Sequence, residues 1–242
     1  MKKILLALFA LAAVSAVSPA VGADLGARPY YNKAPIYTAP GYNWTGFYIG
    51  GHVGGAFSGS NNFNGLVLSD NKSRVLGGVQ VGGDWQFAQN WVLGVEGQYS
   101  WLGNGGFNAA FPGAFVYNSD QRGLGSITGR IGYTWGLGLL YVKGGYAYSD
   151  NSDTLRLAGV PVVFALNGDH RDGYTVGAGV EYVFVPNWSL KGEYQYYNFG
   201  STRFVTPVAL APFGSFQLDE HTVKLGVNYR FTLGGPAVVA RY

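Results

Sequence analysis

Residues 222–231 read TVKLGVNYRF, and this stretch decides the fold class. Every second residue is apolar: Val223, Leu225, Val227, Tyr229 and Phe231. The intervening positions are polar, charged or glycine: Thr222, Lys224, Gly226, Asn228 and Arg230. A period of two places successive side chains on opposite faces of a β-strand. The stretch therefore predicts a strand whose two faces meet different environments.

Seven further segments repeat this alternation, so the chain is predicted to be all-β, an eight-stranded antiparallel up-and-down transmembrane β-barrel. These segments cover residues 44–57, 74–87, 91–101, 122–135, 139–149, 171–184 and 188–199. Their lengths suit tilted strands that cross a bilayer, each of which needs about 9–11 residues.

The connections between these segments alternate between short and long. Short turns are predicted at residues 88–90, 136–138 and 185–187. Long loops are predicted at residues 58–72, 103–121, 150–170 and 200–218. Outer-membrane barrels have short periplasmic turns and long extracellular loops, so contacts with outside partners are expected to depend on the loops.

The composition excludes several classes of protein. Charged residues make up 12% of the chain, about half the usual share. Aromatic residues make up 16%, yet the mean hydropathy is only +0.07. Cysteine is absent, which rules out disulfides, zinc–thiolate sites, a cysteine nucleophile and a lipoprotein anchor. The net charge of +3 gives no electrostatic reason to expect nucleic acid as a partner.

The N-terminus predicts an export signal. Lys2 and Lys3 precede the apolar run Ile4–Val17, and Val21-Gly22-Ala23 supplies a small-x-small cleavage site. A membrane anchor or a buried helix is the alternative, but the run is shorter than the roughly 20 residues of a spanning helix. Cleavage after Ala23 divides the chain into a signal peptide (1–23), an extended periplasmic leader (24–43), a β-barrel (44–231) and a C-terminal tail (232–242). The leader is interpreted as a linker, with a binding motif as the alternative.

One face of the strands carries almost all of their charged residues. They are Asp84, Glu96, Arg130, Lys143, Glu181, Lys191, Glu193, Lys224 and Arg230. A soluble, lipocalin-like barrel would turn this face outward. The export signal and the aromatic residues favour the opposite arrangement, because each Lys or Arg facing lipid costs about 2–4 kcal/mol at mid-membrane. The lumen of an eight-stranded barrel is filled by side chains, so these charges are expected to form a connected ion-pair network that closes it.

An internal echo supports a closed barrel with an even number of strands. Residues 84–91 resemble residues 181–188, and the same offset relates Glu96 to Glu193. This places two acidic hairpins four strands apart, with Arg130, Lys143, Lys224 and Arg230 on the strands between them and Lys191 beside Glu193. Convergence of two hairpins on the same chemistry is the alternative to a true repeat.

Aromatic residues flank the predicted short turns: Trp85, Phe87, Trp91, Trp135, Tyr182, Phe184 and Trp188. Rings of this kind lie at the boundary between membrane and water. The pattern therefore predicts an aromatic girdle at the periplasmic side.

The histidines give weak evidence for chemistry. His52 is expected to face the lumen, whereas His170 and His221 are expected near the external rim, beside different loops. Two rim histidines could ligate a metal or haem iron, but isolated polar rim residues are the favoured account. No local pairing of Ser or Asp with His is present, so neither an enzyme nor a catalytic residue, cofactor or metal is predicted.

Four motifs carry a family resemblance: Ala23-Asp24-Leu25, the opening WTGFYIGG (44–51), the strand end NYRF (228–231) and the closing GGPAVVARY (234–242). They resemble the outer-membrane immunogenic proteins of alphaproteobacteria, which are small porin-family barrels with an OmpA-like transmembrane fold. The resemblance implies an abundant envelope protein of the cell outer membrane whose loops meet the host or the surroundings. Some members of the family are haem-binding or porin-like, but no haem motif is present here to carry that property over.

Three functions stay open on the sequence. The first is a structural and surface-interaction barrel without an open channel; the others are a narrow non-specific porin and a loop-borne binder of haem or another ligand. The expected partners are outer-membrane lipid, the barrel-assembly machinery, periplasmic chaperones and a host or extracellular ligand. Phe231 and Tyr242 are alternative aromatic signals for assembly.

Overall fold

The computed structural model describes residues 42–58, 67–70, 73–103, 106–111, 113–166, 171–206 and 215–233. The predicted signal peptide, most of the predicted leader, His170 and Tyr242 lie outside these residues. The described residues all belong to one compact unit, Ala39–Tyr242.

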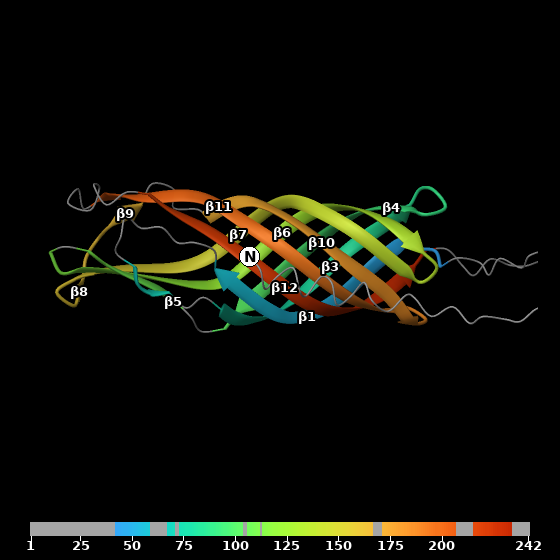
Figure 1. Cartoon of the computed structure of the whole chain (residues 1–242), viewed down its shortest axis with the longest axis horizontal. Helices are drawn as coiled ribbons and strands as arrows, with labels where there is room; N and C mark the ends of the chain where they lie inside the picture. Colours follow the sequence, from blue (N-terminus) through green and yellow to red (C-terminus); the bar gives the residue numbers. More distant parts are fainter. Residues whose placement is uncertain are drawn as a thin grey trace, which may run out of the picture. The chain divides into compact units, whose positions relative to one another are not determined.

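Eight long strands make up the described fold (Figure 1). They are β1 (Gly46–Ser58), β3 (Ser73–Gln86), β4 (Trp91–Leu102), β6 (Phe115–Trp135), β7 (Gly138–Leu157), β10 (Arg171–Val185), β11 (Trp188–Thr206) and β12 (Ser215–Thr232). Four short strands accompany them: β2 (Val67–Asp70), β5 (Gly106–Phe111), β8 (Val160–Pro161) and β9 (Ala165–Leu166). Across the described ranges, no helix is both long and apolar enough to span a membrane.

The eight long strands close into a barrel. Neighbouring long strands pair antiparallel in chain order, and β1 also pairs with β12, from Gly46 opposite Thr232 to Ser58 opposite Glu220. The hairpins β3–β4 and β10–β11, which carry the internal echo, lie on opposite walls of this ring. The predicted eight-stranded antiparallel barrel is confirmed, and closure leaves the long strands without an unpaired edge inside the barrel.

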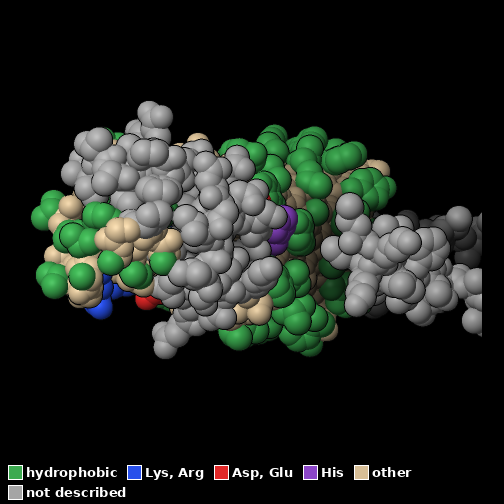
Figure 2. All heavy atoms as spheres, turned by 60° about the vertical axis from the view of Figure 1, so that its left-hand side comes forward, with side chains coloured by type: hydrophobic (Ala, Val, Ile, Leu, Met, Phe, Trp, Pro, Cys, Tyr) green, Lys and Arg blue, Asp and Glu red, His purple; other side chains and the backbone are tan. Residues whose placement is uncertain are grey.

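The apolar face of the barrel points outward, the reverse of a soluble protein. In β12, Val223 is 51% exposed and Leu225 is 60% exposed, whereas Lys224 between them is 1% exposed. Hydrophobic side chains cover the barrel surface that is visible in Figure 2. Only a lipid environment makes such a surface favourable, because lipid replaces the water that these side chains avoid.

All four loop predictions are wrong in part. The predicted loop 58–72 contains β2, and the predicted loop 103–121 contains β5 and the start of β6. The predicted loop 150–170 contains the end of β7 with β8 and β9, and the predicted loop 200–218 contains the end of β11 and the start of β12. These strand extensions lie beyond the lipid-facing apolar band, where the regular alternation of apolar and polar residues is lost. Pairing between β6 and β7 nevertheless continues to Phe115 opposite Leu157.

Candidate functional site: the barrel lumen

The structure places all nine charged residues of the predicted network in the lumen. Each of them is buried, with a relative exposure between 0% and 6%. The alternation explains this placement, because each occupies the inward position of its strand. Ion pairs within 4.0 Å join the nine side chains into one connected set, which divides into two clusters.

The lower cluster pairs two arginines with two carboxylates near the short turns. Arg130 donates from Nε to Asp84 at 2.8 Å and from Nη1 to Glu181 at 3.2 Å. Arg230 donates to Glu181 at 2.8 Å and also contacts Asp84. The two arginines and two carboxylates balance in charge. Arg130 also approaches Glu96 at 3.9 Å, which links this cluster to the next.

The upper cluster joins opposite walls of the barrel. Lys143 of β7 lies 2.7 Å from Glu96 of β4 and 3.0 Å from Glu193 of β11. Lys191 contacts the same two carboxylates at 2.8 and 3.4 Å. Lys224 reaches Glu193 at 3.1 Å. This cluster therefore holds three ammonium groups and two carboxylates, a surplus of one positive charge.

Tyrosines complete the network, and sequence reasoning missed them. The Tyr48 hydroxyl donates to Glu96 at 2.8 Å, and the Tyr141 hydroxyl donates to Glu193 at 2.8 Å. The Arg130 guanidinium lies over both rings, 4.6 and 5.0 Å from their centroids. Both tyrosines occupy inward positions of their strands, as the charged residues do, so the alternation of the sequence was sufficient to predict that they face the lumen.

Two lumen glycines make room for these rings. A Cβ atom at Gly82 would lie 2.3 Å from the Tyr48 hydroxyl, and one at Gly179 would lie 2.5 Å from the Tyr141 hydroxyl. The ring from one strand therefore crosses the glycine of its neighbour, a close approach that the missing side chain permits.

An apolar cluster covers the turn end of the network. It consists of Trp44, Val92, Leu139, Tyr141 and Val183. The Arg230 guanidinium lies 4.6 Å from the Trp44 ring. The charged groups therefore end directly on an apolar layer.

A second apolar cluster covers the loop end. It consists of Leu124, Ala147, Tyr197 and Phe199, with Leu102 packed against it. The Lys224 ammonium lies 5.6 Å from the Tyr197 ring. The ion network thus lies between two apolar layers, and neither layer was predicted from the sequence.

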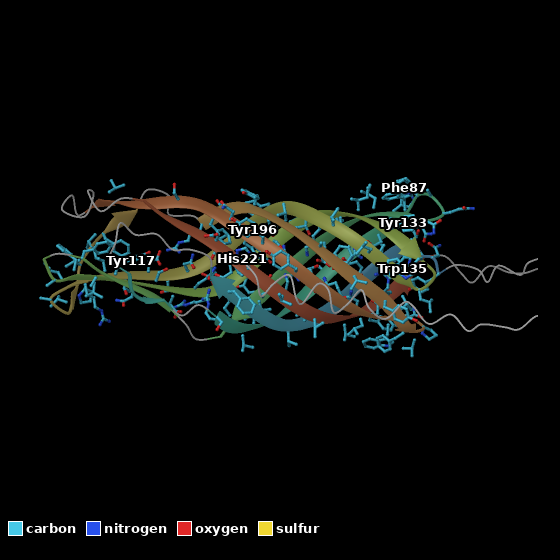
Figure 3. The ribbon with its side chains drawn as sticks, viewed as in Figure 1. Phe87, Tyr117, Tyr133, Trp135, Tyr196 and His221 are labelled. Carbon is cyan, nitrogen blue, oxygen red and sulfur yellow. The ribbon has the colours of Figure 1, made fainter. Side chains whose placement is uncertain are left out.

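The histidines do not converge on a metal site in the part of the chain that the structure describes. His52 lies in the lumen as expected, with its ring nitrogens 3.0 Å from Gln80 and 2.8 Å from Ser100. His221 lies on the outward register of β12, where its ring meets Tyr194 and Tyr196 (Figure 3). No group of three or more His, Cys, Asp or Glu residues that could hold a metal occurs among the described residues.

The seven predicted girdle residues all point outward, with relative exposures between 43% and 60%. Figure 3 shows Phe87 and Trp135 at the turn end of the barrel, together with Tyr133, which the prediction omitted. A second outward aromatic set lies nearer the loop end and was also missed: Phe57, Trp101, Tyr146, Tyr148, Tyr174 and Tyr194. Two aromatic belts around an apolar band are typical of outer-membrane barrels.

Comparison with known proteins agrees with this architecture. The family model described as outer membrane protein beta-barrel domain matches residues 4–231. The 31 kDa outer-membrane immunogenic protein of Brucella melitensis biotype 1 is 30% identical over 249 residues, covering 96% of this chain and 100% of the relative. The 22 kDa outer membrane protein of Rhizobium leguminosarum bv. viciae is 32% identical over 204 residues, covering 82% of each chain.

Among solved structures, the outer membrane protein OprG from Pseudomonas aeruginosa matches with 13% identity and a TM-score of 0.46, covering 80% of this chain and 99% of that one. The resemblance to outer-membrane immunogenic proteins is confirmed by the curated relatives, several of which carry that name. The family match and the curated relatives together establish that this chain belongs to the outer membrane protein β-barrel domain family and is a protein of the outer membrane.

Proposed function

We propose that this chain is a non-conducting outer-membrane barrel that contributes to envelope integrity and holds extracellular strands for contact with the surroundings. The observation that carries the proposal is the buried ion-pair network between two apolar layers. No enzymatic activity is part of the proposal.

The chemistry of the lumen supports closure. A permeating ion exchanges its hydration shell for polar groups that bind it weakly enough to release it. Here each of the four carboxylates already lies within 4.0 Å of at least two bases, as in the 2.7 Å contact between Lys143 and Glu96. The layers at both ends consist mostly of apolar side chains, so they give an ion few polar groups in place of its water.

The extracellular strand extensions support the surface role. Arg171, at the start of β10, donates to Asp153 at 2.8 Å, to the Tyr117 hydroxyl at 2.9 Å and to Ser119 at 3.1 Å. These bonds fasten the extended β6–β7 hairpin to the rest of the barrel above the apolar band. Burial raises the pKa of the Tyr117 hydroxyl, so it stays protonated at this junction. The extensions are therefore built as an ordered platform.

The proposal predicts that the refolded protein leaves lipid vesicles impermeable to small solutes. Proteoliposomes loaded with a polymer should keep their volume in isotonic solutions of small sugars and amino acids, because the filled lumen blocks entry. Empty liposomes are the matched control. Swelling that follows solute size would instead support the narrow porin.

The ligand-binding alternative has its own readout. Titration of the same protein with haem, followed by absorbance, should give no saturable spectral change. A saturable change at a fixed stoichiometry would support a loop-borne haem binder in place of the proposed function.

A further inference from the structure

The extracellular tip of the β7–β8 hairpin is unusually apolar. Residues 157–166 read LAGVPVVFAL and contain no polar side chain. Within this tip segment Val163 is 92% exposed and Val160 is 64% exposed. Figure 2 shows hydrophobic side chains gathered at the end of the molecule where Figure 1 labels β8. An exposed apolar patch of this kind marks an interaction site.

The backbone of the tip segment forms a turn that is hydrogen-bonded to its neighbours. Ala158 and Gly159 form its turn with positive φ angles of 49° and 85°. The Ala158 amide donates to the Ala114 carbonyl of the neighbouring turn at 3.0 Å, and the Val162 amide donates to the Leu155 carbonyl at 2.9 Å. The exposed valines are therefore held in place by backbone hydrogen bonds.

A small core beneath the tip is already filled. The side chains of Tyr117, Leu155 and Phe111 are buried, and the Phe164 ring packs on Tyr117 with its centroid 6.1 Å away. Val160 and Val163 do not contribute to this core, since both stay exposed beside it. Within the part of the chain that the structure describes, no neighbour covers the apolar surface of these two valines.

Any surface that binds the tip segment lies well above the protein's own membrane. Tyr148 belongs to the second outward aromatic set, nearer the loop end, and β7 continues from this residue to Leu157. At roughly 3.3 Å per residue, this extension can raise the tip by up to about 30 Å above the lipid boundary. At that height Val160 and Val163 lie beyond the acyl chains of the barrel's own bilayer.

The chemistry of the tip favours a lipid surface. Protein interfaces combine apolar contacts with about one hydrogen bond per 100–200 Å², and the tip segment has no side chain that can form one. The exposed Arg156 flanks the segment and suits a phosphate group. A symmetric contact between two copies through the tip would bring two Arg156 side chains together, which disfavours a second copy.

We propose that this hairpin tip docks on an opposing phospholipid bilayer, with Val160 and Val163 entering the acyl boundary and Arg156 meeting anionic headgroups. This names a partner for the surface-interaction part of the proposed function and rests on that part alone. It does not depend on whether the lumen conducts.

Vesicle flotation tests the proposal with the full mature protein in nanodiscs. Wild type should float with vesicles of phosphatidylcholine and phosphatidylglycerol, and more weakly with phosphatidylcholine alone. Val160→Ser combined with Val163→Ser should reduce the bound fraction at least about tenfold, because two apolar anchors are lost without a change in charge. Arg156→Gln should reduce binding to the anionic vesicles about fivefold and leave binding to neutral vesicles unchanged.

Thr154→Ser, at an exposed polar position of β7, is the matched control and should bind as wild type does. A heat-dependent gel shift in every variant would show that the barrel is folded. Wild-type flotation that survives the double serine change would overturn the proposal, as would self-association of nanodiscs or dependence on an added protein in place of lipid. Solute entry in the swelling assay with normal flotation would instead count against the closed lumen alone.

Discussion

Replacing Arg130 with methionine is expected to lower the free energy of unfolding by about 3–5 kcal/mol, the usual cost of breaking a buried ion pair from one side. Asp84 would lose the hydrogen bonds that Arg130 donates from Nε and Nη2, and Glu181 would lose the one that Arg130 donates from Nη1. Methionine keeps much of the side-chain volume, so the effect reports the lost charge. Urea unfolding in detergent micelles measures it.

Arg156→Met is the matched control for this substitution. Arg156 is exposed on the extracellular part of β7, so its replacement should change stability by no more than about 0.5 kcal/mol. Equal, small effects of the two substitutions would mean that water reaches Arg130 and that the network is not a dry plug.

Replacing Glu193 with glutamine is expected to destabilise the barrel by a similar amount, about 3–5 kcal/mol. Glu193 is the carboxylate that Lys143, Lys191 and Lys224 share, so its loss leaves Glu96 to balance three ammonium groups. Glutamine preserves the shape of the side chain, and its carbonyl oxygen can still accept the hydrogen bond from the Tyr141 hydroxyl. Urea unfolding again provides the measurement.

Lys224→Met supplies a sharper form of this prediction. On its own it should cost less than Glu193→Gln, because it removes the surplus positive charge and leaves the network with equal numbers of acids and bases. Combined with Glu193→Gln, it should recover at least about 1 kcal/mol relative to additive effects, since the two groups are in contact. Strictly additive effects would show that the pair does not interact in the folded barrel.

The fold and the facing of the lumen charges could be predicted because both depend on a period of two. Lys224 lies between Val223 and Leu225, and that local pattern alone assigns it to the inner face. The alternation persists wherever one face meets lipid, so the transmembrane parts of the strands were found. It fails in residues 115–121, where each face carries both apolar and polar residues, and these strand extensions were therefore interpreted as a loop.

The pairing inside the lumen could not be predicted from the same pattern. Alternation gives the face of a residue but not its height along the barrel, which the register of neighbouring strands fixes. Lys191 lies beside Glu193 in sequence, yet it also reaches Glu96 across the lumen at 2.8 Å. The two apolar layers were missed for the same reason, since each gathers residues from several strands at one height.

The central claim is that the lumen is closed to ions, and the most direct test is the current across a planar lipid bilayer that contains the refolded mature barrel. A separate gel verifies insertion: protein recovered from the bilayer lipid should migrate as the folded barrel without heating and shift its migration after heating. The account predicts a current indistinguishable from that of the lipid alone at moderate voltage in potassium chloride. A steady current that scales with the number of inserted barrels would contradict it and would make the protein a narrow pore.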